Sequence, residues 1–204
     1  MEKKNTSNKI GVILLAAGES SRLGQPKQLL VHDGKTLLQH SLEVANASVA
    51  TPVVLVLGAK AGVIKNEIDG GDAIVVFNAE WEEGMASSIR TGIKTSGEMS
   101  PFAEGMILMV CDQPYINASL LNELVAAHHN KGKAIVTCGY ADTVGPPTLF
   151  HKSLFPELLQ LIGDVGARSV LNKHRDEVEV IPFPQGYLDI DTREDFEKLS
   201  TGHS

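Results

Sequence analysis

The chain has 204 residues, of which 43% are hydrophobic, and a formal net charge of -7. A chain this long can remove roughly 70% of its unfolded surface from water without a disulfide or metal, and its two sparse cysteines, Cys111 and Cys138, favour a reducing compartment. The negative charge argues against nucleic acid as a partner, and no apolar run approaches the ~18 residues of a membrane span. We therefore expect a cytoplasmic protein that acts on small molecules.

Four segments in the first part of the chain are almost continuously apolar and rich in Val, Ile and Leu. They cover residues 10–18, 52–58, 73–78 and 105–112. Such runs are typical of parallel strands that are buried on both faces of a sheet. Apolar residues at helical spacing lie between them, as from Leu38 to Ala45 and from Leu121 to Val125. The alternation predicts right-handed crossovers and a mostly parallel α/β sheet.

The later part of the chain has a looser order of elements. The pattern predicts strands at 134–138 and 178–182, a Gly-Pro-Pro turn at 145–147, a helix near 152–162 and a final helix after 188–192. No repeat, low-complexity segment or linker divides the sequence. We predict a single domain over residues 10–200, preceded by a disordered tail over residues 1–9.

The first predicted strand runs into a turn with the chemistry of a phosphate-binding loop, ILLAAGESSRLGQPKQLL at residues 13–30. A P-loop needs four residues between its glycines and a lysine directly after the second. Here Gly18 and Gly24 enclose five residues, and Lys27 comes three residues later. A dinucleotide-binding fingerprint needs a glycine where Ser20 stands. The glycines are also consistent with a simple tight turn, so the loop alone leaves its role open.

The third and fourth predicted strands end in polar residues, at Asn78 and Asp112. Because parallel strands end at one edge of a sheet, both residues should face the first loop. Loop amides, Arg22 and Lys27 would then hold phosphate oxygens, and Asp112 would hold a divalent cation that bridges them. The combination favours a nucleoside triphosphate. Asp112 is also placed to cap a helix that follows Pro114, which is a common structural role for aspartate.

Six motifs occur together along the chain in a fixed order. They are LAAGESSRLGQPKQLL, NAEWEEGMASSIRTGI, CDQPYI, GPPTLF, GDVGAR and DIDTREDF. Over about residues 10–199 the chain resembles the MobA-like nucleotidyltransferases, and among them the molybdenum cofactor cytidylyltransferase branch. The resemblance implies a three-layer, Rossmann-like fold of the nucleotide-diphospho-sugar transferase type. It also implies Mg²⁺-dependent transfer of CMP from CTP to the terminal phosphate of molybdopterin, with release of pyrophosphate.

The resemblance further implies roles for individual residues. The implied catalytic residues are Arg22, Lys27 and Asp112. Asp112 would be the principal metal ligand, completed by Asp189 or Asp191, which share one face of the DIDT segment if that segment is extended. Arg168 would lie near the acceptor. The implied nucleotide-binding residues are Ala16, Ala17, Gly18, Ser20, Gly24, Asn78, Gly84, Met85 and Ser88.

Several related functions share these motifs. LAAG instead of LAGG in the first loop favours cytidine within the family, and GDVGAR favours the molybdopterin branch. The alternatives are a guanylyltransferase that uses GTP, a cytidylyltransferase for another small phosphorylated acceptor, and a non-catalytic cofactor carrier. Lys27 and Asp112 argue against the carrier, because a carrier has no need of a catalytic metal ligand. A molybdoenzyme or its chaperone is the expected recipient of the product.

Overall fold

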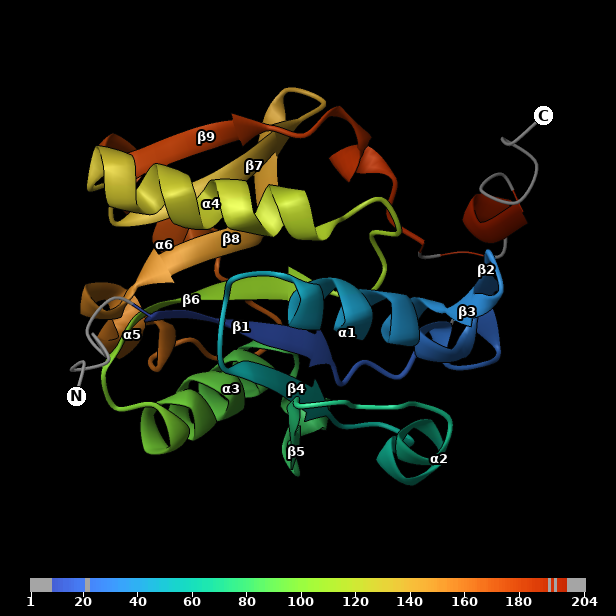
Figure 1. Ribbon diagram of the computed structural model, residues 1–204. Helices are drawn as coiled ribbons and strands as arrows, with labels where there is room; N and C mark the ends of the chain where they lie inside the picture. Colours follow the sequence, from blue (N-terminus) through green and yellow to red (C-terminus); the bar gives the residue numbers. More distant parts are fainter. Residues whose placement is uncertain (1–8, 21–22, 191, 193, 198–204) are drawn as a thin grey trace, which may run out of the picture.

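The computed structural model describes residues 9–20, 23–190, 192 and 194–197. The predicted N-terminal tail therefore lies outside the described residues, apart from Lys9, which begins the first strand. Seven strands form the central sheet (Figure 1). In their order across the sheet they are β5 (Ile74–Phe77), β4 (Val53–Leu57), β1 (Lys9–Ala16), β6 (Ala103–Val110), β8 (Thr143–His151), β7 (Ile135–Tyr140) and β9 (Val178–Pro182).

The sheet confirms the predicted mostly parallel α/β fold. All neighbouring strands are parallel except that β8 runs antiparallel to both β6 and β7. The carboxyl ends of the parallel strands therefore still meet at one edge, where such sheets bind their ligands. A separate small hairpin, formed by β2 (Val31–His32) and β3 (Lys35–Thr36), precedes the first helix.

Helices cover both faces of the sheet (Figure 1). They are α1 (Leu37–Ala47), α2 (Ala61–Asn66), α3 (Met85–Met99), α4 (Ala118–Lys131), α5 (Phe155–Leu158) and α6 (Arg168–Lys173). Two of them begin at side-chain caps, since Thr36 accepts the amide of Gln39 at α1 and Asn117 accepts that of Leu120 at α4. The helix after Pro114 is thus capped by Asn117, and the capping role considered for Asp112 is wrong.

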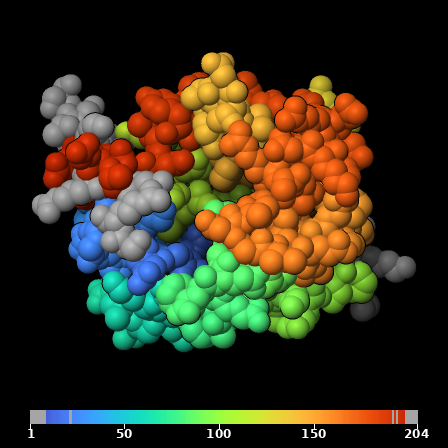
Figure 2. Space-filling view, turned by 180° about the vertical axis from the view of Figure 1, so that it is seen from behind, coloured from blue at the N-terminus to red at the C-terminus, as the bar shows by residue number. Residues whose placement is uncertain are grey.

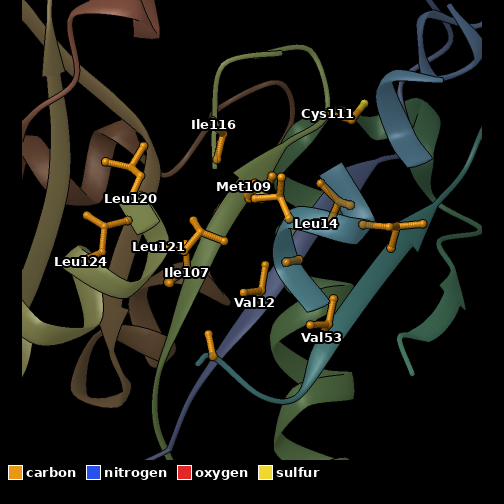
Figure 3. Close-up of a cluster of buried hydrophobic side chains, with 14 of the residues drawn as sticks. Val12, Leu14, Val53, Ile107, Met109, Cys111, Ile116, Leu120, Leu121 and Leu124 are labelled. Carbon is orange, nitrogen blue, oxygen red and sulfur yellow. The ribbon is translucent and has the colours of Figure 1, made fainter. Parts of the chain in front are cut away.

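The central strand β1 supplies side chains to two hydrophobic clusters, because successive strand residues point to opposite faces. Val12 and Leu14 belong to the cluster beneath α1, α2 and α4, whereas Ile13 belongs to the cluster beneath α3, α5 and α6. Figure 3 shows the first cluster, to which β1, β4, β6 and α4 all contribute labelled side chains. The apolar run at the start of the chain is therefore buried on both faces, as its composition predicts. Because β1 is a central strand, the loop that follows it lies in the middle of the sheet edge.

The predicted turn at 145–147 is wrong, because these residues lie within β8. The register between β7 and β8 moves from Thr137 opposite Thr148 to Cys138 opposite Gly145. This bulge leaves Pro146 and Pro147 outside the β7–β8 pairing, where their missing N–H groups disturb no ladder bond.

Two further expectations need correction. The helix predicted near 152–162 is limited to a 3-10 turn, Lys152–Leu154, and the short α5. The strand β5 is not buried on both faces, because it lies at the edge of the sheet and Phe77 is 57% exposed. The final helix is described over residues 194–197. Within the described part of the chain, no helix is long and apolar enough to cross a membrane.

Candidate active site

The loop after β1 is held in shape by a buried glutamine, Gln28, of which 1% is exposed. Its Nε2 donates to the carbonyl oxygens of Ala16 and Gly18, both at 2.9 Å, and its Oε1 accepts from Ser20 Oγ at 3.4 Å. Ser20 Oγ also accepts the backbone amide of Lys27 at 3.0 Å. These bonds occupy both amide hydrogens of Gln28 and fix the loop relative to Lys27.

The Lys27 side chain reaches the carboxylate that follows β6. Its Nζ donates to Oδ2 of Asp112 in an ion pair, and the two side chains are 20% and 15% exposed. The main chain of Asp112 is held as well, because its carbonyl accepts the amide of Ile190 at 3.1 Å. Ile190 of the DIDT segment therefore lies beside Asp112. The ion pair itself joins residues that are 85 positions apart along the chain.

The other carboxylate oxygen of Asp112, Oδ1, is buried and has no hydrogen-bond partner among the described residues. A buried charged oxygen is unfavourable unless a cation or a donor compensates it. No cluster of three or more His, Cys, Asp or Glu residues that could hold a metal ion occurs in the described ranges. A carboxylate oxygen such as Oδ1 is also the kind of ligand that a divalent cation such as magnesium prefers.

Cys111 directly precedes Asp112 but offers no reactive thiolate. Burial, followed by the nearby negative charge of Asp112, raises the pKa of the Cys111 thiol to about 12. The thiol therefore stays protonated near neutral pH and behaves as a small buried apolar group. The charged chemistry at this strand end rests with Asp112.

The segment after β5 forms a second wall of the site. Asn78 is buried, and its Nδ2 donates to the hydroxyls of Ser87 at 2.8 Å and Ser88 at 3.0 Å. Its Oδ1 accepts a backbone amide two residues further on at 3.0 Å. Gly84 is the N-cap residue that precedes α3, with a φ of 116°, and a Cβ there would lie 2.8 Å from the backbone of Asp164. This turn thus requires glycine for both its conformation and its close contact.

These elements enclose a cavity of about 280 Å³, which we call the loop cavity. Figure 2 shows this side of the molecule hollowed where the loop after β1, the segment around α3 and the loop before α6 come together. The predicted site residues that line the loop cavity are Ala16, Ala17, Gly18, Lys27, Gly84, Met85, Ser88 and Asp112. Residues from three separate strand ends therefore meet at one cavity, as the sequence predicts.

A second cavity of about 400 Å³, here named the side pocket, adjoins the first. The two share Leu15, Met85 and Val110 in their walls. Arg168 and Asp189 line the side pocket, and Arg168 Nη2 donates to Thr143 Oγ1 at 2.6 Å. The pocket thus combines an apolar wall with opposite charges.

Among the described residues, Ser20, Gly24 and Asn78 do not line the loop cavity. Ser20 and Asn78 instead form hydrogen bonds to residues of the loop after β1 and of α3. Their contact with nucleotide stays a prediction. Gly24 lies in the turn before Lys27 with a φ of 69°, which favours glycine. Arg22 and Asp191 lie outside the described residues.

Sequence reasoning missed Gln28 as part of the site. A polar residue amid the apolar end of PKQLL was a usable signal, because a buried amide needs partners and the nearby loop offers carbonyls. It also assigned no site role to Trp81, Glu82 or Asp164, which line the loop cavity. Their places depend on how distant segments pack, which no local pattern reports.

Residues 12–178 match the model of the MobA-like NTP transferase domain family. The chain belongs to this family. Rv0371c of Mycobacterium tuberculosis is 34% identical, with a TM-score of 0.80 over 95% of this chain and 98% of the other. A structure of Rv0371c in complex with manganese gives 31% identity and a TM-score of 0.76, covering 94% of this chain and 98% of the other.

Two relatives that match most of the chain are named for different activities. Nicotine blue oxidoreductase of Paenarthrobacter nicotinovorans is 29% identical over 92% of this chain and 94% of its own length. A probable molybdenum cofactor guanylyltransferase of Nostoc is 27% identical over 92% of this chain and 89% of its own length. Membership in the MobA-like family makes the chain a nucleotidyltransferase and confirms the resemblance recognised in the sequence. The Rossmann-like fold is confirmed as well.

Proposed function

We propose that the protein transfers CMP from CTP to the terminal phosphate of a molybdopterin-type acceptor and releases pyrophosphate, with Mg²⁺ as its metal. The observation that carries this proposal is the Lys27–Asp112 ion pair, which lies in the loop cavity beside the side pocket. In this assignment the loop cavity holds the nucleoside triphosphate and the side pocket holds the acceptor. Their shared wall brings the two reacting groups together.

The residues present fit a divalent cation, because the buried Oδ1 of Asp112 has no hydrogen-bond partner among the described residues. Asp112 would hold Mg²⁺, with Asp189 or Asp191 as the second carboxylate. When bound, the cation would offset negative charge on the phosphate oxygens. The relative Rv0371c has been crystallised in complex with manganese, which supports the proposal that the present chain also binds a divalent cation.

The chain's own residues would act mainly by positioning and by charge. A terminal phosphate is already an anionic nucleophile near neutral pH, so no side chain needs to remove a proton from it. Arg168 would orient the acceptor in line with the α-phosphorus, and Lys27 would stabilise the charge of the departing pyrophosphate. The hydrogen bonds of Gln28 would hold the backbone amides of the loop after β1 in position to bind the pyrophosphate oxygens.

The choice of cytosine over guanine is the finer part of the proposal. Ala17 packs closely beside Gly58, where an added Cβ would lie 2.8 Å from the Ala17 Cβ and 2.5 Å from that of Trp81. Ala17 and Trp81 also line the loop cavity, and in this proposal their side chains limit the room for the base to that of a pyrimidine ring. The alternatives are GTP as the nucleotide substrate and another phosphorylated compound as the acceptor. A molybdoenzyme or its chaperone would receive the product. We expect the reaction to take place in the cytoplasm.

The test offers the protein each of four nucleoside triphosphates with Mg²⁺, with and without molybdenum-loaded molybdopterin. Pyrophosphate release is measured, and the product is identified by mass. We expect release with CTP only when the acceptor is present, together with a cytidine dinucleotide product. Preferential incorporation of guanosine would replace the cytidylyl assignment by the guanylyl one. Turnover with CTP only on another phosphorylated compound would reject molybdopterin.

A further inference from the structure

Residues 161–168, which follow α5 and end at the first residue of α6, contribute to both cavities, and we call them the shared loop. Its Asp164 lines the loop cavity, whereas its Arg168 lines the side pocket. Met85, in the wall common to both, lies against the shared loop at Gly166, where an added Cβ would come 3.0 Å from the methionine sulfur. Any displacement of this loop would therefore alter both cavities together.

Two charged residues fasten the shared loop to the turn that begins α3. Arg90 Nη1 donates to the carbonyl of Leu161 at 2.7 Å and to Glu83 Oε1 at 2.7 Å. The same Oε1 accepts the amide of Gly163 at 3.1 Å, and the carbonyl of Gly163 accepts the amide of Ala86 at 3.1 Å. The side chain of Arg90 is 16% exposed. One carboxylate and one guanidinium thus bind the shared loop through two of its backbone groups.

This arrangement is strongly charge-assisted. Hydrogen bonds from Arg90, and then from the amide of Gly163, lower the pKa of Glu83 to about 2, so its carboxylate stays ionised at neutral pH. Hydrogen bonds between ionised groups are shorter and stronger than neutral ones. Glu83 therefore keeps its acceptor role throughout the pH range of an ordinary assay.

A second carboxylate beside Arg90 provides a natural comparison. Glu80 Oε2 lies 3.3 Å from Arg90 Nη2, and the Glu80 side chain is 73% exposed. Among the described residues, no hydrogen bond joins the Glu80 side chain to the shared loop. Glu80 and Glu83 thus pair with the same arginine, but Glu83 also holds the loop.

We propose that Glu83 and Arg90 are positioning residues that set the shared loop for both substrates. Within the described part of the chain neither side chain lines the loop cavity or the side pocket, so they act through the residues that do. Loosening the loop would weaken nucleotide and acceptor binding together, because each needs the loop in one position. The inference rests on the proposed roles of the two cavities.

The experiment compares the wild type with Glu83→Gln, Arg90→Lys and the control Glu80→Gln. Glu83→Gln removes the charge but keeps the shape, Arg90→Lys keeps the charge but loses the planar fork, and Glu80→Gln removes a charge that does not hold the loop. Nucleotide affinity is measured by calorimetry, with whichever of the four triphosphates binds the wild type most tightly. Steady-state kinetics then give kcat and both KM values, with the best acceptor found. Melting curves set an assay temperature at which every variant is folded.

We expect Glu83→Gln and Arg90→Lys to weaken nucleotide binding about five- to twentyfold and to raise the acceptor KM by a similar factor, with kcat at saturation within about twofold. Glu80→Gln should match the wild type within about twofold. Unchanged nucleotide affinity in Glu83→Gln, or an equal loss in Glu80→Gln, would overturn the proposal. The calorimetric result does not depend on which base or acceptor the enzyme uses, so it separates this inference from the proposed CMP transfer.

Discussion

The loop cavity and the side pocket are built from different kinds of sequence. The loop cavity takes most of its predicted residues from segments that directly follow β1, β5 and β6, and Gln28 and Asn78 fix two of these segments from inside. The side pocket instead combines the β8 strand, the start of α6 and Asp189 near the end of the chain. The side pocket thus depends on packing between distant segments.

Under the proposed function, the loop cavity would carry out the chemistry and the side pocket would select the acceptor. Gln28 fixes the backbone carbonyls of the loop after β1 by hydrogen bonds within the same short motif. Such a motif can keep the loop geometry proposed for the triphosphate while the rest of the chain varies. A pocket assembled from distant segments can change shape when any one of them changes. Relatives named for unlike activities, an oxidoreductase and a guanylyltransferase, match this chain over nearly its whole length. We therefore expect loop-cavity variants to lose rate and side-pocket variants to change the acceptor.

The largest effect should come from Asp112→Asn. A neutral amide is a poor ligand for a divalent cation and cannot pair with Lys27, so we expect turnover to fall on the order of 10³-fold. Pyrophosphate release and a thermal melt measure activity and folding in the same sample. The exposed Asp72→Asn serves as the charge-matched control. Wild-type turnover in Asp112→Asn would remove this carboxylate from the mechanism.

Next in size is Lys27→Ala, which should lower kcat about a hundredfold and change nucleotide affinity much less. In the proposed mechanism, the ammonium group of Lys27 stabilises charge that develops as pyrophosphate departs. Steady-state kinetics with Lys94→Ala, which removes an exposed lysine of α3, provide the comparison. An effect limited to KM would show that Lys27 only binds the ground state.

A smaller loss is expected for Gln28→Met, which keeps the volume of the buried side chain but leaves the carbonyls of Ala16 and Gly18 without their partner. Unfolding free energy should fall by about 1 to 3 kcal/mol, and kcat/KM should fall about tenfold because the loop is no longer fixed. Denaturant titration and kinetics measure both. Gln25→Met, at an exposed position of the same loop, should change neither. Full activity in Gln28→Met would mean that the loop needs no internal support.

The smallest change concerns base choice. Ala17→Gly removes the methyl group that packs beside Gly58, and we expect it to relax the preference for CTP over GTP by a few-fold, within the ~1 to 3 kcal/mol that one such contact controls. Competition between CTP and GTP in one vessel, with the product identified by mass, gives the ratio directly. An unchanged ratio would place base selection elsewhere, such as the wall formed by residues 81–88.

The sequence predicts the loop cavity far better than the side pocket, and the reasons are physical. Apolar runs mark the strands, and parallel strands must end together, so the sequence predicts that Lys27 and Asp112 meet at one edge of the sheet. The antiparallel β8 escaped prediction because Gly-Pro-Pro is typical of turns, whereas a bulge accommodates it here. Because β8 was not predicted as a strand, its contribution to the side pocket was not predicted either.

The contacts of buried polar groups were the other part that sequence could not supply. Nothing in the local pattern distinguishes Asn78, whose amide is bonded inside the protein, from an asparagine that faces a ligand. Likewise, Glu80 and Glu83 look equivalent in AEWEEG, and only the packing of the shared loop separates their roles. These side chains differ in their hydrogen-bond partners, which belong to segments distant in the sequence. A local sequence pattern does not predict where those segments lie.

The most direct test of the central claim is the fate of labelled phosphorus. CTP labelled at its α-phosphorus, and in a parallel reaction at its γ-phosphorus, is incubated with the protein, Mg²⁺ and molybdenum-loaded molybdopterin. We predict that the α label appears in the dinucleotide product and the γ label in pyrophosphate, and that both transfers are lost in Asp112→Asn but kept in Asp72→Asn. Transfer of the γ label to the acceptor, or an α label that remains in free nucleotide while the triphosphate is consumed, would contradict nucleotidyl transfer at this site.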